Sequence, residues 1–298
     1  MKEELEFMFA LLVSGVSIGL MYSLIALGFV LVYKATDAIN FAQGEFVMLA
    51  GFFTTTALSV KGMPVLAAIV FSIVAMVLLS FALERAVLRP LLGRPVVAVI
   101  MATIGLAAIL RGLPPITIGA QTKNIPLPVP DTPFAIGPAS VPPIQIVGVV
   151  VSLLFLAGFT WFFMKSRMGV AMRAIADNQQ VAMAMGINVE RYFAIAWAMA
   201  GVVSALGGII WGSMLGVDTQ LALVGLKVFP VVILGGLDSI IGAVVGGLIV
   251  GIVESMAAGY LDPLVGGGTK DFAPYVLMIV MLMFKPYGMF GKRKIERI

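Results

Sequence analysis

A few polar and charged side chains interrupt long apolar runs in this sequence, and their chemistry requires partners. Asn40, Gln43 and Glu45 stand close together before one apolar run, and Glu254 lies within another. A charge in apolar surroundings is costly unless it is paired or faces water. Lys227 is the nearest cation without an obvious partner in the same region as Glu254, so we predict a pair between them. Otherwise Lys227 would extend to the edge of the apolar layer.

The stretch from Asn40 to Glu45 has two interpretations. If it is helical, Asn40 and Gln43 share one face, and Gln43 and Glu45 would lie near a pathway or gate. Alternatively, Gln43 and Glu45 form an interfacial cap at the N-terminus of the helix that follows, where the helix dipole favours a carboxylate. We favour the second interpretation. Lys227 and Glu254 likewise have two interpretations: a structural ion pair, or residues of a pathway.

The sequence excludes several kinds of active site. Cysteine and histidine are both absent from the 298 residues, which excludes thiolate and imidazole metal ligands, cysteine nucleophiles and histidine bases. The run Gly266–Lys270 does not have the spacing of a phosphate-binding loop. The net charge of +4 requires no nucleic-acid partner. We therefore predict a chain that is not an enzyme, with no catalytic residues, no metal and no cofactor.

The composition is that of a membrane protein. Of the residues, 61% are hydrophobic and only 11% are charged, whereas about a quarter of the residues in a soluble domain are charged. No water-soluble core could hide this much apolar surface. The sequence predicts an all-α, polytopic helical protein surrounded by the lipid bilayer.

About eight to ten membrane segments are predicted, because a helix needs about 20 mainly apolar residues to cross a bilayer. One segment, Leu226–Gly236, is too short for an ordinary span and is predicted to be a half-helix or a re-entrant segment. Glycines recur at small-xxx-small spacings in two apolar segments, one that contains Gly201 and one that contains Gly251. This spacing predicts closely packed helices. The predicted segments are Phe7–Tyr33, Asn40–Val60, Pro64–Leu83, Val96–Leu113, Ile144–Met164, Phe193–Leu215, Leu226–Gly236, Ile240–Tyr260 and Phe272–Phe284, with Phe290 as an alternative end of the last.

Lysine and arginine predict the orientation, because cytoplasmic loops are enriched in them. With the N-terminus outside and the segments threaded alternately, most of these residues fall on one side, which is predicted to be cytoplasmic; Arg111 falls on the other. The result is a single transmembrane domain over residues 1–298 with a cytoplasmic loop at 165–192 and a cytoplasmic C-terminus. The exterior loop at 114–143 is rich in proline, which forbids helix and favours extended chain. That loop is either a stiff connector or a rim that meets an exterior partner.

The cytoplasmic loop contains signals for a short helix. Asp177 and Asn178 are good N-caps, and Gln180 follows Asp177 at the spacing of a capping box. Gly186 stands where such a helix would stop, and Arg173 is one of the basic residues around it. The segment would form either a capped helix that docks on a soluble partner or a tight turn that only joins two spans.

Several motifs occur together along nearly the whole chain, and in this order they resemble the permease family of bacterial ABC importers for branched-chain amino acids. No single motif is specific, but the ordered set is. The motifs are Ile39–Glu45, Leu83–Arg85 with Arg89–Pro90, Ser166–Gly169 with Arg173–Ala174, Gly186–Asn188, Gly225–Lys227 with Leu234–Gly236, Gly242–Ala243 with Gly246–Gly247, and Lys270–Asp271 with Pro286.

The resemblance implies a permease subunit in the bacterial inner (cytoplasmic) membrane that imports branched-chain or related hydrophobic amino acids. It implies partners: two cytoplasmic ATPase subunits that hydrolyse the ATP, a second homologous permease and an extracytoplasmic solute-binding protein. The loop helix, with Arg173, Asp177, Asn178, Gln180 and Gly186, would then couple the permease to an ATPase. The alternatives are an ABC permease for urea or short amides, and an ion-coupled secondary transporter in which Glu45 or Glu254 contacts the ion.

Overall fold

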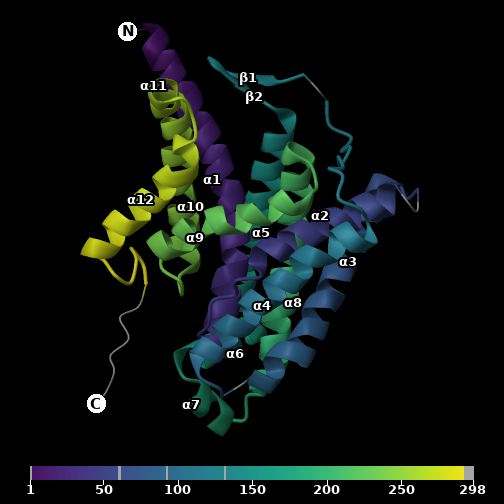
Figure 1. The fold of residues 1–298 in the computed structure, drawn as a ribbon. Coiled ribbons are helices and arrows are strands. Elements are labelled where there is room, and N and C mark those ends of the chain that lie inside the picture. The colour runs from purple at the N-terminus through teal and green to yellow at the C-terminus, as the bar shows by residue number, and fades with distance from the viewer. Residues whose placement is uncertain (1, 60–61, 92, 131, 292–298) are drawn as a thin grey trace. The chain divides into compact units, whose positions relative to one another are not determined.

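The computed structural model describes residues 2–59, 62–91, 93–130 and 132–291, and helices dominate it (Figure 1). Four short π- or 3-10-helical turns and one hairpin, of β1 (Phe134–Ile136) and β2 (Ala139–Val141), complete the described secondary structure. The α-helices are α1 (Lys2–Thr36), α2 (Gln43–Ser59), α3 (Val65–Leu83), α4 (Val96–Thr117), α5 (Pro143–Lys165), α6 (Arg167–Asp177), α7 (Gln179–Ala184), α8 (Val189–Leu215), α9 (Leu223–Gly235), α10 (Ile240–Met256), α11 (Asp262–Val265) and α12 (Thr269–Phe284).

The helix lengths confirm a polytopic helical membrane protein. Within the described residues, six helices are long and apolar enough to cross a membrane. They are Lys2–Thr36, Val65–Leu91, Val96–Thr117, Pro143–Lys165, Val189–Leu215 and Ile240–Val265. The other predicted segments are shorter: α2 has 17 residues, α9 has 13 and α12 has 16. At 1.5 Å per residue, α9 spans about 20 Å, less than the roughly 30 Å of a hydrocarbon core, as expected for the short segment.

Proline explains two differences between the predicted and observed helix ends. Helix α4 continues through Pro114 and Pro115 to Thr117, so the expectation that proline excludes helix from position 114 onward is wrong. The prolines remove hydrogen bonds only from the last turn, and the apolar residues before them maintain the helix. Helix α12 ends at Phe284, so an extension to Phe290 is wrong, because Pro286 disfavours helix in the residue before it. Val60, the predicted end of the second segment, lies outside the described residues.

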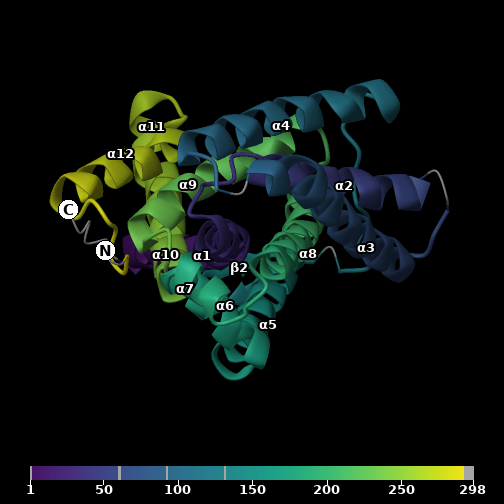
Figure 2. The same ribbon diagram turned by 90° about the horizontal axis from the view of Figure 1, so that it is seen from below.

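The helices form two compact units, and the first comprises Met1–Ala26, Val129–Leu154 and Lys227–Ile298. In it the first half of α1 packs against α10, as both views show (Figures 1 and 2). A Cβ added at Gly251 would lie 2.5 Å from the Cα of Gly19 and would also overlap the carbonyl oxygen of Gly15. Ser255 Oγ donates to the carbonyl oxygen of Leu11 over 2.8 Å. The predicted close packing at small residues is confirmed here.

The second unit comprises Leu27–Pro128 and Phe155–Leu226. Its core is the packing of α2, α3 and α8, with α4 against α2. Close approach again depends on glycine: a Cβ at Gly208 of α8 would overlap the carbonyl oxygen of Val47 in α2. Large buried aromatic side chains fill the space between these helices, and Phe46 and Trp197 meet edge to face with ring centroids 5.9 Å apart. This core positions the polar groups of α2 and the loop that precedes α8.

Candidate coupling segment and polar clusters

The segment between α5 and α8 contains two capped helices. Ser166 caps α6, with its Oγ accepting from the N–H of Gly169 over 2.9 Å. Asn178 caps α7, with its Oδ1 accepting from the N–H of Val181 over 3.0 Å. Asp177 is the last residue of α6 and does not cap α7, so the predicted capping box from Asp177 to Gln180 is wrong. The chain turns to extended backbone at Asn178, with φ −157°, and this residue alone takes the capping position.

Helix α7 stops where the glycine signal predicts. Gly186 has φ +83°, a left-handed conformation that glycine adopts without the steric cost of a Cβ. The N–H of Gly186 donates to the carbonyl of Met183, and the N–H of Ile187 donates to that of Ala182, each over 3.0 Å. These two bonds form a Schellman motif. We define residues 166–188 as the coupling segment. Side-chain caps fix the starts of α6 and α7, and the Schellman motif fixes the end of α7.

Side chains fasten the coupling segment to neighbouring helices. The guanidinium of Arg173 donates to the backbone carbonyl of Phe163 in α5 and lies 5.6 Å from the centroid of that ring. Lys34 of α1 approaches the same ring to 5.5 Å. Gln179 Nε2 donates to the carbonyl oxygen of Ala35 over 3.1 Å. The side chain of Arg173 therefore attaches the coupling segment to α5, and the whole segment belongs to the second unit.

Several apolar side chains of α7 and its C-cap are exposed. Val181, Met183 and Met185 are 57%, 53% and 78% exposed, whereas Ala182 is buried. Gln180 is also exposed. A short, well-capped helix that presents valine and methionine outward has the features of a helix that docks in an apolar groove.

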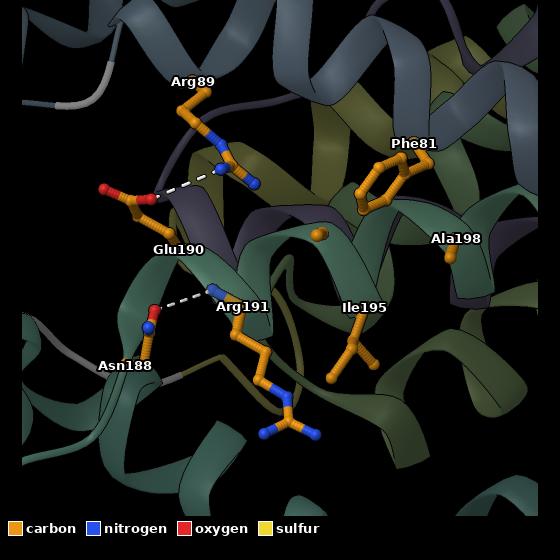
Figure 3. A pocket seen from close by; sticks show the side chains of 8 residues that line it. Phe81, Arg89, Asn188, Glu190, Arg191, Ile195 and Ala198 are labelled. Carbon is orange, nitrogen blue, oxygen red and sulfur yellow. Dashed lines mark hydrogen bonds and ion pairs between the residues drawn. The ribbon is translucent and has the colours of Figure 1, made fainter.

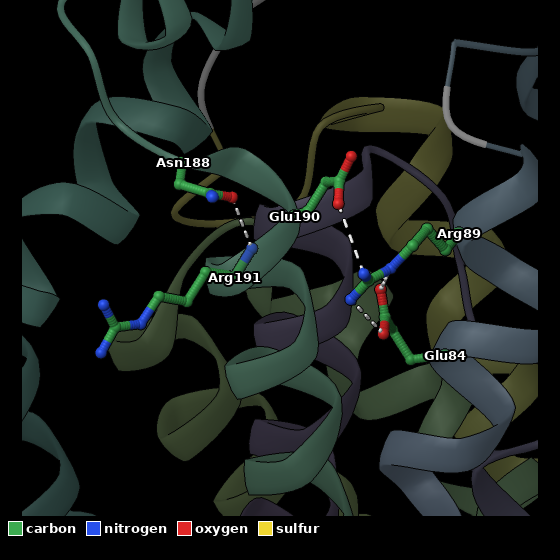
Figure 4. A network of polar contacts seen from close by, with 5 residues as sticks. All are labelled: Glu84, Arg89, Asn188, Glu190 and Arg191. Atoms are coloured by element: carbon green, nitrogen blue, oxygen red, sulfur yellow. Dashed lines mark hydrogen bonds and ion pairs between the residues drawn. The ribbon is translucent and has the colours of Figure 1, made fainter.

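A polar network joins the end of this segment to the turn after α3 (Figure 4). Arg89 donates from Nε and Nη2 to the two carboxylate oxygens of Glu84, over 3.1 and 3.0 Å, and from Nη1 to Glu190 over 3.3 Å. Glu84 is buried, whereas Glu190 at the start of α8 is exposed. Asn188 Oδ1 caps α8 by accepting from the N–H of Arg191 over 3.0 Å. The two-point pair with Glu84 fixes the Arg89 guanidinium within the turn after α3. The single bond from Arg89 to Glu190 then joins that turn to the start of α8.

A pocket of about 350 Å³ lies beside this network (Figure 3). Its lining is polar at the Arg89–Glu190 end and apolar along α3 and α8, and the guanidinium of Arg191 points away from the Arg89–Glu190 pair. In the part of the chain that the structure describes, no group of three or more acidic, histidine or cysteine side chains is placed to hold a metal ion. The lining residues are Phe81, Arg89, Asn188, Glu190, Arg191, Ala194, Ile195 and Ala198.

Asn40 and Gln43, predicted as pathway or gate residues, are bonded to each other inside the second unit. Asn40 Nδ2 donates to Gln43 Oε1 over 3.3 Å, and Gln43 Nε2 donates to Ser204 Oγ of α8 over 3.0 Å. All three residues are fully buried. Asn40 precedes α2, so it shares no helical face with Gln43; its Oδ1 accepts from the N–H of Ala42 instead. The network fixes the start of α2 against α8.

Glu45 has a partner that sequence reasoning missed. It lies in the first turn of α2, as the helix-terminus interpretation expects, but it is only 2% exposed and forms an ion pair with Arg111 of α4. Arg111 Nε donates to Glu45 Oε1 over 3.1 Å, and Nη2 donates to the same oxygen. The missed signal was a single arginine inside an otherwise apolar helix. A lone arginine at the centre of a membrane helix costs roughly 2.5–3.5 kcal/mol, which predicts a partner.

The predicted pair between Lys227 and Glu254 is confirmed in the first unit. Lys227 Nζ lies 2.9 Å from Glu254 Oε1 and 2.8 Å from Asp271 Oδ1. Tyr22 of α1 donates its hydroxyl to Glu254 Oε2 over 2.8 Å. Asp271 and Tyr22 were not predicted, because neither stands near Lys227 or Glu254 in the sequence. Glu254 therefore receives one donor on each oxygen.

Comparisons with known proteins match this architecture along its length. The family model described as "Branched-chain amino acid transport system / permease component" matches residues 11–284. The permease BraD of Pseudomonas aeruginosa, named for high-affinity branched-chain amino acid transport, is 31% identical over 96% of this chain and 97% of its own. The permease LivH of Escherichia coli K12, named likewise, is 30% identical over the full length of both chains. A probable LivH of Methanocaldococcus jannaschii is 30% identical over 92% of this chain and 90% of its own.

A solved structure shares the fold. It is that of PsaBC from Streptococcus pneumoniae in complex with Fab, with a TM-score of 0.50 and 13% identity over 95% of this chain and 94% of that chain. At this identity the likeness concerns the fold alone. The match to the family model and the identity along whole relatives show that this chain belongs to the family of branched-chain amino acid transport system permease components.

Proposed function

We propose that this chain is the membrane permease of an ATP-driven importer for branched-chain or related hydrophobic amino acids. The names of the relatives BraD and LivH support this class of substrate. The excess of lysine and arginine in alternate loops supports an N-terminus outside the membrane and a C-terminus in the cytoplasm. A permease of such a system works with ATPase subunits and a solute-binding protein, so ATP is hydrolysed outside this chain.

The coupling segment carries the mechanism that we propose. An ATPase would receive α7 in a groove through Val181, Met183 and Met185, which are exposed. When ATP draws the ATPase subunits together, the push on α7 would reach α5 through the Arg173 contact. It would reach the turn after α3 through the start of α8, where Glu190 bonds to Arg89. The finer arrangement we propose is two ATPases and a second homologous permease, each permease presenting one coupling segment. Asn40, Gln43, Glu45, Lys227 and Glu254 remain proposed residues of the pathway or its gate.

Replacing Asn178 with alanine should weaken coupling. The variant loses the side-chain acceptor for the Val181 N–H, which costs about 1 kcal/mol of helix stability. Since α7 is only six residues long, we expect ATP-driven uptake to fall by roughly fivefold, the factor that 1 kcal/mol represents. Asn178→Asp, which keeps an acceptor oxygen, is the matched control and should transport normally. Normal uptake by a stably inserted Asn178→Ala variant would count against a coupling role for α7.

The partners can be tested directly. We expect mild-detergent purification of this chain from its native membrane to bring ATPase subunits and a second permease, identified by mass spectrometry. Replacing both Val181 and Met185 with aspartate should release the ATPases and retain the second permease, because charged side chains cannot enter an apolar groove without a desolvation cost. A homo-oligomer without ATPase, under conditions that preserve known transporter complexes, would contradict the proposed function.

A further inference from the structure

Arg111 occupies an unusual place in α4. It is the single charged residue of that helix, and its side chain is 46% exposed. Ile104, two turns earlier on the same face, is 43% exposed. A guanidinium on an apolar helix face is unfavourable against lipid, so residues of this kind face water or protein in an assembled membrane protein.

The ion pair of Arg111 with Glu45 leaves part of the guanidinium available. Both hydrogen bonds from Arg111, from Nε and from Nη2, end on Oε1 of Glu45. Within the described ranges, Arg111 Nη1 and Glu45 Oε2 bond to no other residue. Because the Glu45 side chain is only 3% exposed, its carboxylate orients the guanidinium, and Nη1 of the half-exposed Arg111 is the donor left for a ligand.

Two prolines add acceptors next to this pair. In a regular helix the N–H groups at positions 114 and 115 would bond to the carbonyls of Leu110 and Arg111. Pro114 and Pro115 have no N–H, so both carbonyls lose their regular donors. The helix surface is also open here, because a Cβ at Gly112 would meet no atom of the described residues within 4 Å. An exposed guanidinium, an open helix surface and a carbonyl without its regular donor therefore lie together near the end of α4.

We propose that Arg111, oriented by Glu45, receives the charged head of the amino acid as it passes through the permease. The α-carboxylate would take Nη1 of Arg111, and the α-ammonium would take a carbonyl that the proline turn leaves without its regular donor. Such a site contacts only the groups that all amino acids share, so it serves hydrophobic side chains of different shapes. The proposal rests on the proposed function, since it requires that amino acids are carried. The buried Asn40–Gln43–Ser204 network holds the first turn of α2 in place for Glu45.

The test uses the complete transporter in proteoliposomes, with both permeases, the ATPases and the leucine-loaded binding protein. The variants are Arg111→Gln, Glu45→Gln and the double variant. We expect each to carry at least roughly tenfold less leucine per ATP hydrolysed, in line with the loss of a desolvated charge contact. Complex assembly and ATP hydrolysis stimulated by the binding protein should stay unchanged. Arg94→Gln, which removes an exposed arginine outside the helices, should transport as the wild type does.

Two outcomes would overturn the proposal. If the ion pair only supports the fold, removing both charges together should restore coupling that each single variant loses, because neither charge is then left alone. Loss of the second permease from the purified double variant would instead assign Arg111 to the contact between permeases. Failure of the proposed function gives a different result, since the wild type itself would then show no ATP-driven uptake of leucine.

Discussion

Replacing Gly251 with leucine should prevent the first unit from folding stably. The added Cβ would meet the backbone of Gly15 and Gly19 in α1, and backbone cannot move aside as a flexible side chain can. Overpacking of a well-packed core costs typically 1–3 kcal/mol, and we expect more than about 3 kcal/mol here because two helices would have to separate. The measurement is the thermal unfolding midpoint and the yield of monodisperse protein in mild detergent.

Gly158→Leu is the matched control. Gly158 lies in α5, is exposed, and has no described atom within 4 Å of an added Cβ. That variant should unfold at the wild-type temperature, and Gly251→Ala should fall between the two. A Gly251→Leu variant as stable as Gly158→Leu would mean that α1 and α10 do not pack as described.

Replacing Lys227 with methionine should destabilise the first unit strongly. The substitution leaves Glu254 buried with the Tyr22 hydroxyl as a donor, and it removes the cation from Asp271. Breaking a buried pair by removing one partner costs about 3–5 kcal/mol. Because the Lys227 side chain is 27% exposed, we expect a loss near the lower end of that range. The measurement is again the free energy of unfolding in detergent, by denaturant or heat.

The double variant Lys227→Met/Glu254→Gln separates structure from transport. It removes both charges, so we expect most of the stability to return. If the pair also serves the pathway, as proposed, ATP-driven uptake should stay low in this stable double variant. Full recovery of uptake would assign the pair to structure alone. A single variant as stable as the wild type would contradict the ion pair itself.

The sequence predicted features whose cause is local or has few alternatives. Charges are so scarce in the apolar runs that Lys227 was the natural partner for Glu254, and the two do pair. Glycine spacing predicted close packing, and Gly186 predicted a helix end, because small side chains and left-handed backbone depend on residue type alone. The polytopic helical fold also followed from residue types alone, because the composition is too apolar for a water-soluble core.

Features that depend on distant segments were missed. Arg111 stands near the end of an apolar stretch, where a cation can reach the membrane surface, and this hid its need for a partner. Nothing local identified Glu45 as that partner. Asp177 has the chemistry of a cap, but the buried spacing of Gly169, Met172 and Ile175 extends α6 up to it. The arginines around these residues obscured the apolar spacing of this amphipathic helix in the sequence. Tertiary packing, which the sequence does not display, decided each of these cases.

The most direct test is leucine uptake by the complete transporter in proteoliposomes, with ATP supplied on the side of the ATPases. We predict uptake that requires ATP and the binding protein and that a protonophore leaves unchanged. It should fall when Asn178 is replaced with alanine. Uptake that proceeds without ATP and collapses with the protonophore would contradict the ATP-driven mechanism and would point to ion coupling through Glu45 or Glu254.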